Sequence, residues 1–480
     1  MSGQRTTGAP AIAAPIAFGT SGWRGISGLD FSLPRVRIAA GAVAAWLRET
    51  GAAGEVVVAH DSRPGGEDFA DATSLILRTH GFAVARARSV TPTPAVTRAV
   101  IARAAAAAVV FTASHNPPEY AGMKVFGPEG GSLESRHTQR IEALAAAGVR
   151  ASGSRVSRDG SSAPEHEVDL ISAYVRDLLG EIDGEAMGRA GHRVVYDAMH
   201  GAGAGVLDRA LGECGLAPRV LRGDPDPLFG GVAPDPIPER LTALVHAVRS
   251  TDGPVLGLAT DGDADRFAVV DGNGRVLSET EAMALLVDHL ARTGRIEGGV
   301  AISIATGTLV ERVAESHGLR VERHPIGFKY LARALLGGGV DAAGEESGGF
   351  ALGRFGRDKD GMLAGCFFAE MLAMDPTPLA TRLTALAERH GPRLCGRRAL
   401  AGSDDERGVF AKLLAEPPEH VDGVRVERVQ RGDGLHLALE DGFLMLRASG
   451  TEHLLRIYAE APSAEALERR FAAGRSLLAG

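Results

Sequence analysis

A serine stands where a buried strand is expected to end and a rigid loop to begin. Ser114 follows the apolar run 109–111 and precedes Asn116, Pro117 and Pro118, which restrict the loop. Enzymes of the α/β class place their chemistry at such strand ends. An isolated serine there most often caps a turn, but the restricted loop favours a nucleophile. The segment lacks the GxSxG turn of α/β hydrolases, so acyl transfer is disfavoured.

Three aspartates alternate further along the chain, at Asp261, Asp263 and Asp265. An EF-hand calcium loop is excluded because Arg266 occupies the position that needs glycine and Gly272 the position that needs glutamate. The apolar runs on both sides predict buried strands, and three carboxylates in a buried turn repel one another without a cation. A metal site is therefore favoured over a solvated acidic turn. Mg²⁺ held there keeps positions for a phosphate oxygen and water.

A nucleophile and a hard-cation site together indicate phosphoryl transfer through a phosphorylated serine, because the cation offsets the charge of the phosphoryl group. Two further segments suit a sugar phosphate. The loop 344–349 carries carboxylate and hydroxyl groups that can hold sugar hydroxyls, with a plain surface turn as the alternative. The segment 447–456 combines two arginines, two hydroxyl side chains and a glycine, which suit a phosphate dianion. The glycine-rich loop 18–25, with one arginine, is a weaker candidate.

The elements that must position these groups follow a repeated pattern. Three segments, beginning at Val56, Arg193 and Val300, each combine an apolar strand, a polar or glycine-rich loop, a helix and a second short strand introduced by glycine. Such recurrence predicts three related α/β units. In the C-terminal part, short strands are predicted at 424–429, 435–439, 443–446 and 454–458, with a helix from about Ser463. That order is typical of a small α+β domain with an antiparallel sheet.

A chain of 480 residues is too long for one hydrophobic core, so several domains are expected. The segment 151–165 is rich in serine, glycine and arginine and is predicted to be a linker or exposed loop. We predict an α/β domain with the serine loop, an α/β domain with the metal loop, an α/β domain with the sugar loop, and an α+β phosphate-binding lid. Their predicted bounds are 1–168, 169–275, 276–387 and 388–480.

Composition narrows the function classes. A net charge of −8 with two Trp and five Tyr argues against a nucleic-acid partner. The apolar run 104–111 is far shorter than the ~18 residues of a membrane span, so no membrane partner is expected. Residues 1–15 lack the apolar stretch of a signal peptide. The widely spaced Cys214, Cys366 and Cys395 indicate neither a disulfide framework nor a zinc site, which favours the reducing cytoplasm.

Taken in order, these segments resemble the α-D-phosphohexomutase family, which includes phosphoglucomutases, phosphomannomutases and phosphoglucosamine mutases. The resemblance extends from Phe18 to Tyr458, and its most specific elements are TASHNP at 112–117 and DGDADR at 261–266. It implies three related α/β domains and a C-terminal domain that closes as a lid, all arranged around a central cleft.

The resemblance also implies roles for individual residues. Ser114 is expected to be the phosphoserine and to share the Mg²⁺ ion with Asp261, Asp263 and Asp265. The residues expected around the reacting phosphoryl group are Arg24, His115, Lys124 and Arg266, with Lys124 as a candidate general acid or base. The expected substrate contacts are Thr20, Lys329, Glu346, Ser347, Arg447, Ser449, Gly450, Thr451 and Arg456.

The implied reaction interconverts glucose 1-phosphate and glucose 6-phosphate through glucose 1,6-bisphosphate, which turns around before it returns a phosphoryl group to the serine. Glucose is favoured because the sugar loop ends in Gly349, where dual-specificity and glucosamine enzymes often have histidine, and because of the nearby segment 357–361. Ala448 and His453 replace prolines that many relatives have, so a less rigid phosphate loop is expected.

Alternatives remain at this point. Within the family they are a phosphomannomutase or a dual-specificity hexose mutase, since no side chain dedicated to C2 of the sugar is visible. A phosphatase would need water access to the phosphoserine. A non-catalytic sugar-phosphate-binding protein belongs to a different class and is disfavoured by the intact serine, aspartates and lysine. The expected partners are hexose phosphates, and the expected state is a monomer or homodimer.

Overall fold

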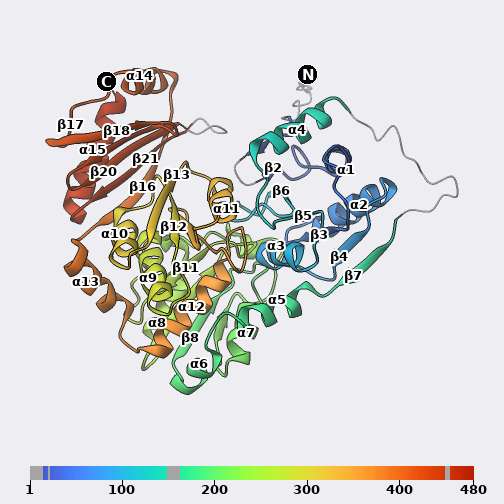
Figure 1. Ribbon diagram of the computed structural model, residues 1–480, viewed down its shortest axis with the longest axis horizontal. Helices are drawn as coiled ribbons and strands as arrows, with labels where there is room; N and C mark the ends of the chain where they lie inside the picture. The colour runs from blue at the N-terminus through green and yellow to red at the C-terminus, as the bar shows by residue number, and fades with distance from the viewer. Residues whose placement is uncertain (1–14, 20–21, 149–162, 449–453, 480) are drawn as a thin grey trace, which may run out of the picture.

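The computed structural model describes residues 15–19, 22–148, 163–448 and 454–479. Within these ranges the strands form four sheets (Figure 1). Three are mixed sheets with helices, and the fourth, at the upper left of Figure 1, is antiparallel. We call the four parts of the chain built around these sheets the first, second, third and C-terminal units. The predicted fold class, three related α/β units followed by an α+β unit, is confirmed.

The first unit contains a seven-stranded sheet in the order β1-β2-β6-β5-β3-β4-β7. Its strands are β1 (Phe18–Gly19), β2 (Gly22–Ile26), β3 (Val56–His60), β4 (Val84–Ala87), β5 (Ala107–Phe111), β6 (Tyr120–Phe126) and β7 (Glu165–Val168). One face is covered by α1 (Leu33–Glu49), α2 (Gly66–Thr79) and α4 (Ser135–Ala146), and the other by α3 (Thr93–Ala102). Both faces are therefore buried, which explains why β3 and β5 are continuous apolar runs rather than alternating ones.

The second and third units each contain a four-stranded sheet, in the orders β11-β10-β8-β9 and β13-β12-β14-β15. The strands are β8 (Arg193–Asp197), β9 (Arg219–Leu221), β10 (Val255–Thr260), β11 (Phe267–Val270), β12 (Gly299–Ser303), β13 (Arg320–His324), β14 (Ala342–Glu345) and β15 (Gly349–Leu352). The helices are α5 (Leu170–Leu179), α6 (Gly184–Ala190), α7 (Leu207–Glu213), α8 (Thr242–Arg249), α9 (Glu279–Arg292), α10 (Thr308–Ser316), α11 (Phe328–Gly337), α12 (Gly361–Met374) and α13 (Leu379–His390).

The three mixed sheets repeat one pairing scheme. A central strand, β3, β8 or β12, pairs in parallel with a strand on each side. One of those neighbours, β5, β10 or β14, then turns back into an antiparallel hairpin with β6, β11 or β15. The serine loop, the aspartate loop and the sugar loop are the turns of these three equivalent hairpins. Three segments far apart in sequence thus occupy one topological position.

The C-terminal unit contains the sheet β16-β21-β20-β19-β18-β17, in which every pair is antiparallel. Its elements are β16 (Leu394–Ala401), α14 (Asp404–Ala415), β17 (His420–Val421), β18 (Val424–Arg431), β19 (Leu435–Leu439), β20 (Gly442–Ala448), β21 (Leu454–Ala461) and α15 (Ala464–Ala479). Sequence reasoning found four of these strands and missed β16 and β17. The segment of β16 contains a glycine and two adjacent arginines, so no alternating pattern marks it as a strand.

The hydrophobic cores do not follow the units one to one. A single large cluster of buried side chains runs through the second and third units and includes Leu258, Val300 and Phe367. Its centre is α12, which is apolar on every side apart from the buried Glu370 and contacts β10 and α7 of the second unit. A helix that is hydrophobic all round must be buried, and here two sheets bury it.

Two expectations about boundaries can be compared with the structure. The predicted linker 151–165 lies largely outside the described residues, and at its end Glu165 already begins β7, which pairs with β4. The return strand of the second unit begins at Arg219 rather than at the glycine at 215.

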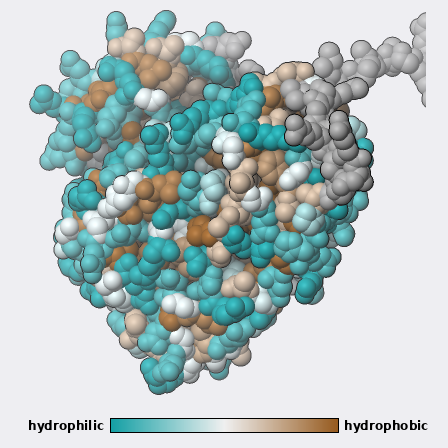
Figure 2. Space-filling view, turned by 45° about the vertical axis from the view of Figure 1, so that its right-hand side comes forward, coloured by the Kyte–Doolittle hydropathy of each residue, from teal (hydrophilic) through white to brown (hydrophobic). Residues whose placement is uncertain are grey.

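The face of the molecule in Figure 2 is mostly hydrophilic, with hydrophobic residues in small separate groups. None of the helices in the described ranges has the length and apolar character needed to cross a membrane.

Candidate active site

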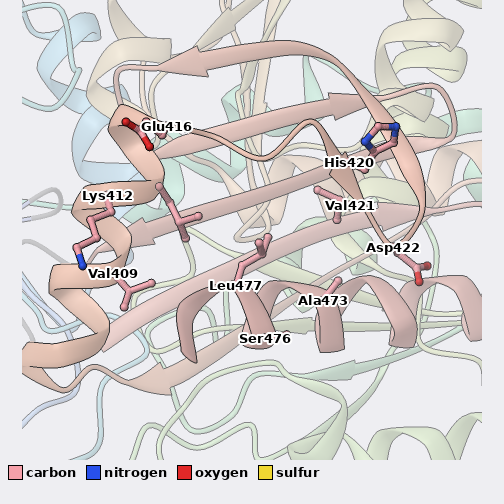
Figure 3. A pocket seen from close by; sticks show the side chains of 10 residues that line it. Val409, Lys412, Glu416, His420, Val421, Asp422, Ala473, Ser476 and Leu477 are labelled. Atoms are coloured by element: carbon pink, nitrogen blue, oxygen red, sulfur yellow. The ribbon is translucent and has the colours of Figure 1, made fainter. Parts of the chain in front are cut away.

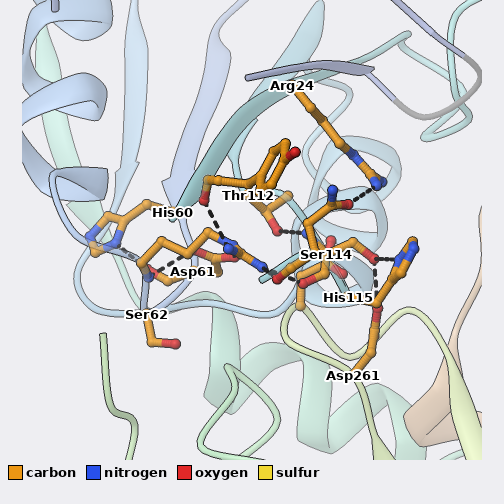
Figure 4. A network of polar contacts seen from close by, with 12 residues as sticks. Arg24, His60, Asp61, Ser62, Thr112, Ser114, His115 and Asp261 are labelled. Carbon is orange, nitrogen blue, oxygen red and sulfur yellow. Dashed lines mark hydrogen bonds and ion pairs between the residues drawn. The ribbon is translucent and has the colours of Figure 1, made fainter. Parts of the chain in front are cut away.

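Ser114 points out of the first unit toward the aspartate loop of the second (Figure 4). Its backbone adopts φ +53°, and its N–H donates to Thr112 Oγ1 at 2.8 Å. This left-handed conformation turns the side chain away from the line of β5. The Ser114 hydroxyl then donates to Asp261 Oδ2 at 2.6 Å and lies 3.4 Å from His115 Nδ1. A strained, buried serine held against a carboxylate from another unit is typical of a functional site.

The serine loop is fixed by a buried arginine that sequence reasoning did not select. Arg63 donates from Nη2 to the carbonyls of Ser114 and Asn116, each at 2.6 Å, and from Nη1 to those of Pro117 and Tyr120, each at 2.8 Å. Asp61 in turn holds Arg63, accepting from its backbone N–H at 2.9 Å. Their position in the sequence could have indicated a role in the site, because Asp61 and Arg63 follow β3 just as Ser114 follows β5.

The aspartate loop approaches the serine loop so closely that one of its residues must be glycine. A Cβ atom added to Gly262 would lie 2.6 Å from the carbonyl oxygen of Ser114, which is backbone and cannot move aside cheaply. Gly262 therefore sets the separation between the serine hydroxyl and the carboxylates on either side of the glycine.

The three predicted metal ligands form one buried cluster. The carboxylates of Asp261, Asp263 and Asp265 offer ligand atoms that all lie within 4.8 Å of one another. Lys124 Nζ donates to Asp263 Oδ2 at 2.6 Å and to Asp265 Oδ2 at 2.7 Å, and Thr93 Oγ1 donates to Asp263 Oδ2 at 2.5 Å. Asp263 Oδ1 and Asp265 Oδ1 are buried without a hydrogen-bond partner among the described residues. Unpartnered hard oxygens in a closed group fit a divalent cation such as Mg²⁺.

Burial controls the electrostatics of this cluster. It raises the pKa of Asp261 well above its ordinary value, and the charges of Asp265 and Asp263 act in the same direction. Burial alone would lower the pKa of Lys124, but the two aspartates it contacts outweigh that effect and raise it. Burial, with the nearby Arg266, lowers the pKa of His115 well below its usual range, so its imidazole is neutral near pH 7.

Three more cations surround the cluster. Arg24 Nη1 donates to Asn116 Oδ1 at 2.5 Å, which places the guanidinium at the serine loop. The backbone N–H of Arg266 donates to Asp261 Oδ1 at 3.1 Å. Lys359, which sequence reasoning did not assign to the site, lies with Nζ 3.2 Å from Asp265 Oδ2 and is buried. Its only sequence signal was its place in the charged segment after β15.

The sugar loop lies directly beside the aspartate loop. Arg266 and Gly349 form an isolated antiparallel bridge, which joins the two hairpin turns through their backbones. Glu346 accepts a hydrogen bond from Ser303 Oγ, and Ser347 Oγ donates to Glu345 Oε1 at 2.6 Å. Burial and the charge of Glu345 raise the pKa of Glu346. The predicted sugar contacts are therefore next to the predicted phosphoryl site.

The remaining predicted contacts are not all gathered at that point. Lys329 Nζ donates to Ser135 Oγ at 2.8 Å, at the start of α4 in the first unit. Arg447 donates from Nε to Asp433 Oδ1 at 2.8 Å, and it pairs with Arg456 across β20 and β21. The predicted contacts Thr20, Ser449, Gly450 and Thr451 lie outside the described residues.

A cavity elsewhere in the C-terminal unit is a different feature (Figure 3). It has a volume of about 520 Å³ and lies among α14, β17 and α15, with Val409, Val421 and Leu477 in its wall. Leu477 packs on the same core as Leu437 and Leu444. Because side chains alternate along a strand, this core lies on the face of the sheet opposite to Met445 and Arg447. The cavity is therefore not part of the candidate active site.

Comparison with known proteins gives a consistent assignment for each of the four units. Models of phosphoglucomutase/phosphomannomutase α/β/α domains I, II and III match residues 15–151, 172–274 and 279–390, and the model of the C-terminal domain matches 404–475. A phosphoglucomutase/phosphomannomutase of Thermococcus kodakarensis is 31% identical over 96% of this chain and 98% of its own length. A phosphoglucosamine mutase of Arthrobacter sp. is 30% identical over 95% of this chain and 96% of its own length.

Solved structures agree in fold. A crystal structure from Thermus thermophilus, provisionally assigned as a phosphomannomutase, superposes with a TM-score of 0.85 at 31% identity, covering 98% of this chain and 100% of the other. A phosphoglucomutase/phosphomannomutase family protein from Burkholderia thailandensis has a TM-score of 0.83 at 24% identity and covers 97% of this chain and 98% of the other. The names of these relatives cover three different sugars.

Proposed function

Because this chain belongs to the α-D-phosphohexomutase family, we propose that it interconverts glucose 1-phosphate and glucose 6-phosphate through a phosphoserine at position 114. The observation that most directly supports this proposal is a contact between two units: the buried Ser114 hydroxyl of the first unit donates to Asp261, which belongs to the buried carboxylate cluster of the second. A phosphorylated serine at this place would put its anionic oxygens beside a cation site, which is what phosphoryl transfer requires.

Each group of residues has a defined task in this proposal. Asp261, Asp263, Asp265 and the phosphoryl group on Ser114 would hold Mg²⁺, which when bound supplies charge compensation for the phosphoryl group. Arg24 and Arg266 add fixed positive charge close to the aspartates. Lys124 is the candidate for moving the proton of the attacking or departing sugar hydroxyl.

The bisphosphate intermediate must turn around, so both ends of the sugar need contacts that accept two orientations. In the first half-reaction Ser114 loses its phosphoryl group to the free hydroxyl of the hexose phosphate, and in the second it regains the other phosphoryl group. Glu346 and Ser347 would grip ring hydroxyls in both orientations. Arg447 and Arg456 would hold whichever phosphate is not reacting, since guanidinium groups can bind phosphate oxygens in pairs.

The preference for glucose is supported by the packing at the end of the sugar loop. A Cβ atom at Gly349 would lie 2.3 Å from Lys359 Cδ, so Lys359 fills the space that a side chain at position 349 needs. A histidine cannot occupy this position while the lysine remains there. The alternative substrates are mannose and glucosamine phosphates, since relatives named for all of these activities match the chain.

A substrate panel tests this assignment. With Mg²⁺ and a trace of hexose 1,6-bisphosphate, we expect the highest kcat/KM for glucose 1-phosphate among glucose, mannose and glucosamine 1-phosphates. A single good polar contact is worth about 1 kcal/mol, so the preference over mannose is expected to be only about tenfold. Equal or reversed ratios for mannose would make the enzyme a dual or mannose mutase. Turnover of glucosamine 1-phosphate alone would make the enzyme a phosphoglucosamine mutase.

Replacement of Arg447 tests the spectator-phosphate contact. In Arg447→Ala we expect a KM for the monophosphate raised by about tenfold or more, and release of 1,6-bisphosphate into solution, because a charged hydrogen-bond partner is lost in both orientations. The matched control is Arg425→Ala, an exposed arginine on β18 of the same sheet. A normal KM without extra bisphosphate release in Arg447→Ala would place the phosphate clamp elsewhere.

A further inference from the structure

One carboxylate connects the predicted phosphate arginine to a different unit of the molecule. Asp433 lies in the turn between β18 and β19. Its Oδ1 accepts from Arg447 Nε at 2.8 Å, and its Oδ2 accepts from the backbone N–H of Ile326 at 2.6 Å. Ile326 belongs to the third unit, in the loop between β13 and α11. Asp433 thus has one oxygen for its own sheet and one for the neighbouring unit.

The contact stands at the edge of a buried interface. Ile326 packs in a small apolar cluster with Ala305 of the third unit and with Phe443, Met445 and Tyr458 of the C-terminal sheet. The side chain of Asp433 is 19% exposed and that of Arg447 16%. Charge-assisted hydrogen bonds are stronger in such surroundings than in water, and they hold their geometry better.

The hydrogen bond to Asp433 also determines which atoms of Arg447 can face a phosphate. Because Nε is directed at Asp433, a phosphate would meet the guanidinium at its Nη1 and Nη2 end. An arginine without this contact would sample many rotamers, and binding would have to order it. Asp433 orders the arginine in advance, and it is fully satisfied only while Ile326 of the third unit is within reach.

We propose that Asp433 is a positioning residue that makes the phosphate-binding geometry of Arg447 depend on docking of the C-terminal unit against the third unit. This inference rests on the proposed function. When the two units separate, Asp433 Oδ2 loses the N–H of Ile326, and the carboxylate is free to rotate away from Arg447. Phosphate binding at Arg447 and closure of the two units therefore favour each other.

A second carboxylate contact anchors the same two units without touching Arg447. The buried Glu460 on β21 accepts from the backbone N–H of Thr308 and from its Oγ1, each at 2.6 Å, at the N-terminus of α10. An ion pair of Arg397 on β16 with Glu279 on α9, at 3.6 Å, is a further link between these units. Loss of Asp433 therefore removes one of several polar links rather than the whole interface. A direct effect on phosphate binding can thus be separated from undocking.

The test is a double-mutant cycle on the full chain with glucose 1-phosphate. Asparagine at position 433 has one acceptor oxygen instead of two, so Asp433→Asn can serve Arg447 or Ile326 but not both. We expect its KM to rise about tenfold with kcat changed less than about threefold, and its bisphosphate release to increase. In the Arg447→Ala background the same substitution is expected to change KM by less than about twofold, because the group it acts through is gone.

The matched control is Asp422→Asn. Asp422 also lies in a turn of the C-terminal unit, where it pairs with Arg469 at the surface, so its substitution is expected to leave KM unchanged. An unchanged KM in Asp433→Asn, or an equal rise of KM with and without Arg447, overturns the inference. If Asp433→Asn does not fold, Asp433→Glu keeps the charge but displaces the guanidinium, and a raised KM then supports the inference while an unchanged one opposes it. Inactivity of the unmodified enzyme on every hexose phosphate instead refutes the proposed function.

Discussion

Ser114→Ala is expected to lose isomerase activity by several orders of magnitude while it keeps the fold. The hydroxyl is the proposed phosphoryl carrier, and no route through a phosphoserine survives its removal. The structural cost is small because the substitution removes one hydrogen bond to Asp261 and leaves the loop held by Arg63. Initial rates with glucose 1-phosphate give the loss of activity, and thermal unfolding checks the fold.

Intact-mass measurement provides a second readout for the same variant. The active protein should carry one phosphoryl group that Ser114→Ala lacks. Ser62→Ala is the matched control, because Ser62 follows β3 as Ser114 follows β5 but points away from the aspartate loop and donates to the His200 carbonyl (Figure 4). An unphosphorylated active enzyme together with an active Ser114→Ala would exclude the covalent route.

The second large effect is expected from the metal site. Asp263→Asn removes one charge from the carboxylate cluster, and we expect activity to fall by at least about a hundredfold. Folding should change much less, because asparagine has the same shape and can still accept hydrogen bonds from Lys124 and Thr93. Excess chelator should abolish the activity of the unmodified protein, and added Mg²⁺ should restore it.

Calorimetric titration with Mg²⁺ measures the site independently of turnover. The unmodified protein should bind the ion, Asp263→Asn should bind it at least about tenfold more weakly, and the surface variant Asp252→Asn should behave like the unmodified protein. Full activity in excess chelator would show that the three aspartates form only an acidic turn held by lysines.

The parts of the site that sequence reasoning could predict are those that a local pattern marks. Ser114, the alternating aspartates and Glu346 each stand in a polar turn directly after an apolar run, and the structure places all three turns at the same point of equivalent hairpins. Strand ends and turn residues depend on neighbours in sequence. The sequence therefore predicts where these loops lie along the chain, whereas it does not predict which contacts they make.

The parts that sequence reasoning missed depend on contacts between distant segments. Arg63 acts on a loop of the same sheet, Lys359 reaches a carboxylate of the second unit, and Asp433 joins the third and C-terminal units. Each is an ordinary charged residue in its own segment, and only the sheet register and the docking of units give it a partner. Strand β16 was missed for a related reason, because its pairing with β21 rather than its own pattern makes it a strand.

The core shared by the second and third units has a consequence for how this protein unfolds. The matched family domains divide the chain between these two sheets, yet α12 is buried by both. Neither sheet therefore keeps its apolar contacts when the other unfolds. The two units therefore form one cooperative block in thermal unfolding, flanked by the first and C-terminal units with cores of their own. A fragment cut between them would expose the apolar surface of α12 or of the strands beneath it, which is a direct route to aggregation.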